Sequence, residues 1–313
     1  MTKLLATLLE TPALKRSRLI LDRSPGLYTW LTISPALIWV AVFTVFPFAY
    51  AAFLSVHKYH LIQPDHPFVG LQNYLRVVGD ELFVIAGGNT LLFTAIGALL
   101  VIGLGLSVAL LLNNQLRGFG VLRALVLLPW AIPLVSAGIL WKLMLHGNFG
   151  AINGLLLQLG FIDHYTTFLS QMPRAFASII FVHVWREFPL ATILFLAGLQ
   201  TIPPEYYDAA KVDGAGRLAR FWYVTLPSLR TTFLIVLVYE TMIGLAVFDL
   251  VYVLTGGGPG TGTTLTAWLA WTTTFKSLNL GRGAALSFIM AITLGALVLV
   301  FLRVLRIEEE AST

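Results

Sequence analysis

The sequence predicts an all-α polytopic membrane protein with six transmembrane helices. Of its 313 residues, 58% are hydrophobic and only 11% are charged, whereas about a quarter of the residues of a soluble domain are charged. The mean hydropathy is +0.84. The apolar runs are long and lack strict alternation, so helices are expected rather than the strands of a barrel.

Six runs approach the length of about 20 apolar residues that a helix needs to cross a bilayer. They are Trp30–Val56, Asn89–Asn113, Val121–Leu145, Ala175–Gln200, Ser228–Leu254 and Ala284–Leu305. The first run could instead be a signal peptide, because Ala49–Ala51 resembles a cleavage site. Its apolar stretch is longer than that of a typical signal peptide, so we expect it to be retained as a span.

The distribution of Lys and Arg predicts that both termini lie in the cytoplasm, because short inner loops are enriched in basic residues. In that orientation 13 of the 20 basic side chains lie inside, six lie outside and Arg186 lies within a span. We expect a cytoplasmic tail over residues 1–28 and one membrane domain over 29–313. The net charge of +5 is dispersed between apolar runs, which indicates contact with a lipid bilayer rather than with nucleic acid.

The loop between the fourth and fifth runs, residues 202–227, predicts a short helix followed by a sharp turn on the inner face. Pro204 suits the first position of a helix, where its missing N–H costs nothing. Glu205 and Asp208 fall in the first turn, where the helix dipole favours negative charge. Gly214 permits the chain to reverse after this helix.

A second short helix is expected from Arg217, so the loop forms a helix–turn–helix unit. Tyr206, Tyr207 and Phe221 could anchor this unit in a groove of a soluble partner. It could equally be an interfacial loop that only connects two spans, and physical reasoning alone does not separate the two interpretations.

The same loop resembles the EAA loop of the permeases of binding-protein-dependent ABC transporters. The similarity lies in Glu205-Tyr-Tyr-Asp-Ala-Ala-Lys-Val-Asp-Gly214, followed by Gly216 and Leu226-Pro227. In that family the loop holds a coupling helix that docks into a cleft of the ATPase subunit. The resemblance implies that the ATPase-coupling residues are Glu205, Tyr206, Asp208, Ala209, Ala210, Asp213 and Gly214.

Further segments are similar to the carbohydrate-uptake subgroup of maltose and glycerol-phosphate permeases. They are Phe68–Tyr74, Leu128–Pro133, Trp185–Pro189, Ala197–Pro204 and Phe248–Pro259. The resemblance covers roughly Trp30 to Leu305 and implies the type I importer permease fold in a bacterial or archaeal plasma membrane. It also implies a second homologous permease subunit, two ATPase subunits and an extracytoplasmic binding protein that delivers a sugar, a disaccharide or an oligosaccharide; glycerol phosphate or a polyol is the alternative cargo.

Charged residues at membrane depth usually face a bundle interior or an aqueous path, and the fourth and fifth runs contain three of them. Alignment of the Phe-Pro and Gly-Gly-Pro anchors with the maltose permease implies a set of substrate-pathway positions. They are Arg186, Glu187, Leu190, Glu240, Ile243, Gly244 and Val247. Glu240, Ile243, Gly244 and Val247 would share one helical face, and Pro189 would interrupt the fourth helix.

This pathway departs from the family pattern, because the amides expected on the fifth span are missing and three charges stand at the mapped positions. Arg186 could therefore form a structural ion pair with Glu240 or Glu187 instead of, or as well as, lining a path.

A hydrophobic re-entry is expected over Thr264–Thr274. Trp268 and Trp271 are expected in an interfacial aromatic belt.

The chain has no Cys, no nucleotide motif and no catalytic constellation. We therefore expect a transport subunit rather than a membrane enzyme, with no cofactor and no metal site. A channel or receptor that works alone is the rival class, but the inward EAA-like loop and the missing nucleotide motif imply a separate motor.

Overall fold

A computed structural model describes residues 25–113 and 119–312. The expected cytoplasmic tail therefore falls almost entirely outside the described residues, and its boundary at residue 28 stays a prediction. The chain divides into two compact units, Met1–Leu54 and Ser55–Thr313. Each unit is described by itself.

The first unit contains one apolar helical run, which comprises α3 (Pro25–Val40), the π-helical turn η1 (Ala41–Val45) and α4 (Phe46–Ser55). Residues Thr29–Ser55 are long and apolar enough to cross a membrane. The run ends within one residue of the predicted end.

The second unit is built from helices joined by turns and loops, and its described residues contain two isolated β-bridges but no β-strand. Its longer helices are α6 (Glu81–Leu112), α7 (Phe119–Ala131), α8 (Leu134–Met144), α10 (Arg174–Gln200), α14 (Arg230–Ala246) and α17 (Leu280–Ser312). Its shorter elements are α5 (Gln72–Val78), α9 (Ala151–Gln158), α11 (Pro204–Val212), α12 (Arg217–Arg220), η2 (Phe221–Thr225), α13 (Leu226–Ser228), α15 (Asp249–Leu254), α16 (Thr266–Trp271) and η3 (Thr272–Lys276). Across the described part of the chain, four helices could span a membrane, and counting two bent helix pairs as spans gives up to six.

The third predicted run, Val121–Leu145, is a bent pair of helices that together are long and apolar enough for one span. Helices α7 and α8 meet at an angle of 93° around Ile132 and Pro133. Pro133 has no N–H to continue the helical hydrogen bonds. The Lys142 ammonium donates to the carbonyl of Val253 at 2.7 Å and ties α8 to α15.

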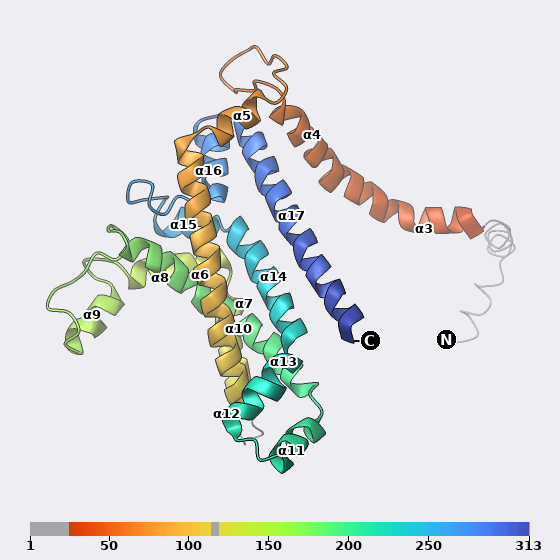
Figure 1. Cartoon of the computed structure of the whole chain (residues 1–313). Coiled ribbons are helices and arrows are strands. Elements are labelled where there is room, and N and C mark those ends of the chain that lie inside the picture. The colour runs from red at the N-terminus through yellow and green to blue at the C-terminus, as the bar shows by residue number, and fades with distance from the viewer. Residues whose placement is uncertain (1–24, 114–118, 313) are drawn as a thin grey trace, which may run out of the picture. The chain divides into compact units, whose positions relative to one another are not determined.

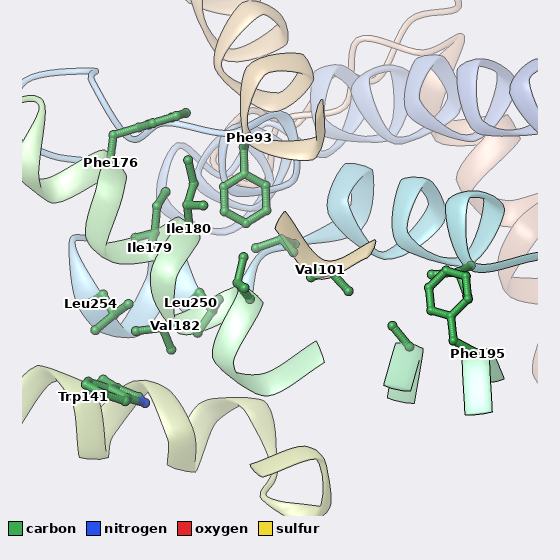
Figure 2. Close-up of a cluster of buried hydrophobic side chains, with 14 of the residues drawn as sticks. Phe93, Val101, Trp141, Phe176, Ile179, Ile180, Val182, Phe195, Leu250 and Leu254 are labelled. Atoms are coloured by element: carbon green, nitrogen blue, oxygen red, sulfur yellow. The ribbon is translucent and has the colours of Figure 1, made fainter. Parts of the chain in front are cut away.

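The core of this unit is formed by α6, α10 and α14, which run side by side (Figure 1). Small residues allow the close approach of α6 and α10, as is usual between membrane helices. A Cβ atom added at Gly105 would lie 2.7 Å from the Cβ of Ala191. Fully buried side chains such as Phe93 and Phe195 fill the space between the helices (Figure 2).

The fifth predicted run is broken twice. One bend of 65° separates Arg217–Ser228 from α14, and buried Leu229 lies between them. At the other end α14 stops at Ala246, because Val247 leaves the helical conformation with φ −58° and ψ 117°, and the short helix α15 follows.

Helix α16 covers the end of α14 and is tied to α6. The backbone N–H of Thr266 donates to the hydroxyl of Thr90 at 2.9 Å. Together α16 and η3 occupy the predicted re-entry. Trp268 is only 5% exposed, and its ring stacks on that of Trp271 with the centroids 5.1 Å apart. The expected position in an interfacial aromatic belt is therefore wrong for Trp268.

Helix α17 returns along the bundle and packs on α5, α14 and α16. Arg282, near its start, forms an ion pair with Asp80. Asp80 also caps α6, because its carboxylate accepts a hydrogen bond from the N–H of Leu82 at 2.8 Å. One carboxylate thus fixes the adjacent ends of two long helices.

Candidate functional site

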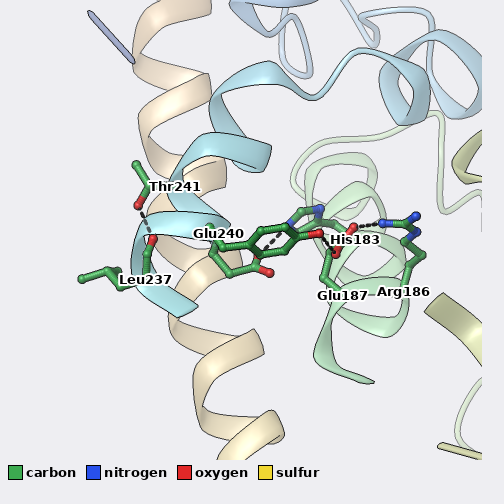
Figure 3. A network of polar contacts seen from close by, with 7 residues as sticks. His183, Arg186, Glu187, Leu237, Glu240 and Thr241 are labelled. Atoms are coloured by element: carbon green, nitrogen blue, oxygen red, sulfur yellow. Dashed lines mark hydrogen bonds and ion pairs between the residues drawn. The ribbon is translucent and has the colours of Figure 1, made fainter. Parts of the chain in front are cut away.

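A buried polar network joins α10 to α14 (Figure 3). His183 Nε2 lies 3.2 Å from Glu240 Oε2, and each side chain is 1% exposed. Phe93 packs against the imidazole with ring centroids 5.0 Å apart. A Cβ atom added at Gly97 would lie 3.1 Å from His183 Cδ2, so α6 holds the imidazole against Glu240.

Arg186 and Glu187 form the second half of the network. The guanidinium pairs with Glu187 Oε1, and Glu187 is fully buried while the Arg186 side chain is 20% exposed. The hydroxyl of Tyr239 donates to Glu187 Oε2 at 3.3 Å. Of the two expected ion pairs, Arg186 with Glu187 is present, and Glu240 has His183 as its partner instead of Arg186.

Several polar atoms around this network are buried without a hydrogen-bond partner among the described residues. They are Thr94 Oγ1, His183 Nδ1, Arg186 Nε and Glu240 Oε1. Thr94 also contacts Gly244, where an added Cβ would lie 2.8 Å from its hydroxyl. A buried polar atom without a partner is costly, so these atoms offer unused donors and acceptors to water or to a polyhydroxylated ligand.

The seven predicted pathway residues are only partly accessible. Arg186, Leu190 and Ile243 are half-buried, and the others are buried: Glu187, Glu240, Gly244 and Val247. Val247 lies beyond the end of α14, so the expectation that it shares a helical face with Glu240 is wrong. The expected interruption at Pro189 is also wrong, because α10 continues through it.

His183 was not among the residues predicted from the sequence. An imidazole within an apolar helix, four residues before Glu187 and therefore on the same face, was the signal that could have found it. Its pairing with Glu240 could not be read from the sequence, because the two residues lie in different helices.

The predicted ATPase-coupling segment forms the expected helix and turn. Helix α11 begins at Pro204 and has Glu205 in its first turn, whereas Asp208 lies beyond that turn, so its expected place there is wrong. Gly214 adopts φ +80°, in the left-handed region that favours glycine. The N–H of Ala215 donates to the carbonyl of Ala210 at 2.8 Å, and the N–H of Gly214 donates to the carbonyl of Lys211 at 3.0 Å. These two bonds form a Schellman motif.

Helix α11 has an inner and an outer face. The hydroxyl of Tyr207 lies 3.1 Å from that of Thr225, which fixes the inner face on η2, and Ala210 is half-buried on the same side. The other coupling residues are exposed: Glu205, Tyr206, Asp208, Ala209, Asp213 and Gly214. Figure 1 shows α11 at one end of the α6–α10–α14 bundle.

Among the residues that the structure describes, no group of three or more His, Asp or Glu side chains could hold a metal ion.

A family model described as "binding-protein-dependent transport system inner membrane component" matches residues 101–309. The trehalose/maltose transport system permease protein MalF of Thermococcus litoralis is 39% identical over 284 residues, which are 90% of this chain and 94% of the relative. The sulfoquinovosyl glycerol transport system permease protein SmoG of Agrobacterium fabrum is 35% identical over 292 residues, covering 92% and 94%.

Among solved structures, a chain of a bacterial ABC transporter involved in the import of the acidic polysaccharide alginate is similar. The TM-score is 0.77 at 24% identity, with 93% of this chain and 98% of that chain covered. A second structure of the alginate transporter, in complex with an alginate pentasaccharide-bound periplasmic protein, gives a TM-score of 0.76 at 23% identity, with 90% and 94% covered. The predicted importer permease fold is confirmed.

Proposed function

The chain belongs to the family of binding-protein-dependent transport system inner membrane components, as its motifs predicted, and we propose that it is a permease subunit that imports a sugar. The names of the relatives support this cargo, since they include a trehalose/maltose and a sulfoquinovosyl glycerol permease. A disaccharide or an oligosaccharide delivered by an extracytoplasmic binding protein is the proposed substrate.

The proposed importer contains a second homologous permease and two ATPase subunits, which hydrolyse the ATP. The chain itself carries no nucleotide motif, so the energy must reach it through a contact. It would be a multi-pass protein of a bacterial or archaeal plasma membrane with both termini in the cytoplasm. The excess of basic residues in the expected inner loops supports this orientation.

The exposed outer face of α11 is the single structural observation that best supports a permease coupled to a separate ATPase. The helix has nine residues and no fully buried side chain, and an isolated helix of that length is marginal in water. The Schellman motif at Gly214 and the contact of Tyr207 with Thr225 hold the helix in place, while Tyr206 is 57% exposed. A rigid helix with an exposed aromatic anchor is suited to docking in a groove of the ATPase.

The polar network is the proposed wall of the sugar path. Arg186 donates hydrogen bonds, and the carboxylates of Glu187 and Glu240 accept them, which matches the hydroxyl groups of a sugar. Half-buried Leu190 and Ile243 add apolar surface for its C–H groups. Gly244 keeps α14 close to α6, and Val247 ends the wall.

The coupling assignment is tested by reversing the charge of Glu205. In the complex with its ATPase and second permease, Glu205→Lys should abolish ATPase co-purification and sugar uptake while membrane insertion persists. Glu81→Lys is the matched control, because Glu81 is also an exposed glutamate in the first turn of its helix, at the opposite end of the bundle. Normal ATPase binding and stimulated hydrolysis in Glu205→Lys would refute the coupling role.

A further inference from the structure

Five aromatic side chains gather beyond the end of α14. Phe248 lies at the break after α14, Tyr252 in α15, Trp268 and Trp271 in α16, and Phe275 in η3. The ring centroids of Phe248 and Trp268 are 5.9 Å apart, those of Phe248 and Trp271 are 5.6 Å apart, and those of Trp271 and Phe275 are 6.1 Å apart. These separations are typical of favourable aromatic contacts.

The exposed fraction of the side chain differs widely among the five rings of this aromatic cluster. Trp268 is 5% exposed and supports the others, whereas Tyr252 is 51% and Phe275 is 64% exposed. Phe248 and Trp271 are half-buried. Packing of the helix ends explains Trp268, but it does not explain why several large rings should present their surfaces away from the core.

Phe248, Trp271 and Phe275 line an open cleft of about 340 Å³ between α16, η3 and α17, a volume within the usual range for ligand sites. Two hydroxyls also line it. The hydroxyl of Thr274 donates to the carbonyl of Ala270 at 2.7 Å, and the hydroxyl of Ser287 donates to the carbonyl of Gly283 at 3.1 Å. Because each hydroxyl proton is already used, both oxygens remain available as acceptors.

A cation lies beside the aromatic rings, next to Phe275 in the sequence but outside the set of residues that line the cleft. The ammonium of Lys276 lies 5.1 Å from the ring centroid of Trp268 and 5.6 Å from that of Trp271, within the range of cation–π contacts. Lys276 is itself exposed, so its remaining N–H groups can donate to a ligand on the same rings.

This combination fits a pyranose ring, which has an apolar C–H face and a rim of hydroxyl groups. The C–H face stacks on the electron-rich face of an aromatic ring. The rim hydroxyls donate to Thr274 and Ser287 and accept from Lys276. We propose that the aromatic cluster around Trp271, with Lys276, is a carbohydrate-binding site at the outer end of the pathway, an assignment that rests on the proposed sugar-import function.

The position of the site along the chain supports this role. Phe248 directly follows Val247, and α14 leads from there to Gly244 and Glu240. The aromatic cluster and the polar network thus lie at successive positions along α14 and its extension. A sugar that enters from the outer side would meet the aromatic rings before it meets the buried carboxylates.

The test measures uptake by the complete importer in proteoliposomes with radiolabelled trehalose, maltose and maltotriose as probes. Trp271→Ala should raise the KM by about tenfold, comparable to the loss found when alanine replaces an aromatic ring that stacks on a nucleic-acid base, with little change in the maximal rate. Trp271→Phe should restore the KM to within about twofold of the wild type. Phe161→Ala, at an exposed aromatic residue outside the cluster, is the matched control and should leave the KM unchanged.

Phe275→Ala serves as a second variant if Trp271→Ala does not assemble, because Phe275 is largely exposed. An unchanged KM in Phe275→Ala and in any assembled Trp271→Ala complex would overturn the site. Loss of the second permease at unchanged KM would identify the rings as a subunit contact, and lower membrane content at unchanged KM would identify them as a bilayer belt; both results also overturn the site. If the wild type imports none of the probes, the proposed sugar function fails together with the site.

Discussion

His183 Nε2 and Glu240 Oε2 lie 3.2 Å apart between two helices, and both side chains are almost completely buried. Glu240 is one of the proposed pathway residues, whereas His183 was not predicted. The pair ties α10 to α14 in the interior of the helix bundle, where a polar group without a partner is costly.

Removal of either partner should impair transport and lower stability, because the remaining polar group would be buried alone. We expect Glu240→Gln and His183→Ala each to reduce the stability of the assembled complex by about 1–2 kcal/mol, the scale of interhelical hydrogen bonds in membranes. The double variant should cost less than the sum of the two single variants. Thermal unfolding of the purified complex measures this coupling, and strict additivity would mean that the pair does not interact.

Glu240→Gln separates the structural and transport roles of the carboxylate. The amide keeps the shape and one acceptor but removes the charge, so we expect assembly to persist while uptake falls or sugar preference changes. Uptake of a panel of labelled sugars measures the effect. Unchanged uptake of every sugar would leave only the structural role.

Gly105 should tolerate no side chain, because the added Cβ would lie 2.7 Å from Ala191. Overpacking of this kind typically costs about 1–3 kcal/mol, so Gly105→Ala should lower the thermal stability. Gly103→Ala, on the same helix with no atom within 4 Å of the added Cβ, is the control. Equal stability of the two variants would contradict the close approach of α6 and α10.

Gly214 has φ +80° and open space around the added Cβ, so a substitution there affects the backbone rather than packing. Gly214→Val should disrupt the end of α11 and uncouple transport, whereas Gly214→Asn should be milder because asparagine tolerates this conformation. Gly216→Ala is the control, since Gly216 has φ −67° and no neighbour within 4 Å. Sugar-stimulated ATP hydrolysis distinguishes the three variants, and full activity of Gly214→Val would show that the Schellman motif is dispensable.

The proposed orientation is testable because the chain lacks cysteine. Single cysteines at Ser17 and Ser312 should resist a membrane-impermeant thiol reagent in intact cells, and a cysteine at Gln63 should react. Reaction of the Ser312 position from outside would reverse the placement of the C-terminus.

Local structure was predictable where the sequence itself specifies the backbone. Pro204 and Gly214 marked the start and the end of α11, and the structure confirms both. The angles of the bends were not predictable, because an apolar run reveals that a segment is buried or in lipid but not its course. Pro133 is a sequence signal for a break between α7 and α8, but the 93° angle and the contact of Lys142 with Val253 involve residues far apart in the sequence. The His183–Glu240 pair and the burial of Trp268 likewise depend on which helices meet.

The 65° bend at Leu229 separates the segment Arg217–Ser228 from α14. Leu229 is fully buried, and an added Cβ at Gly198 would lie 2.9 Å from it, so the pivot is pinned against α10. Glu240 lies about 16 Å further along α14 at 1.5 Å per residue. A turn of about 10° at this pivot would sweep the carboxylate through about 3 Å over that lever arm, enough to break its contact with His183. Because Tyr207 of α11 contacts Thr225 and the N–H of Leu229 donates to the carbonyl of Thr225 at 3.1 Å, α11 and the buried His183–Glu240 pair lie on the two sides of this bend.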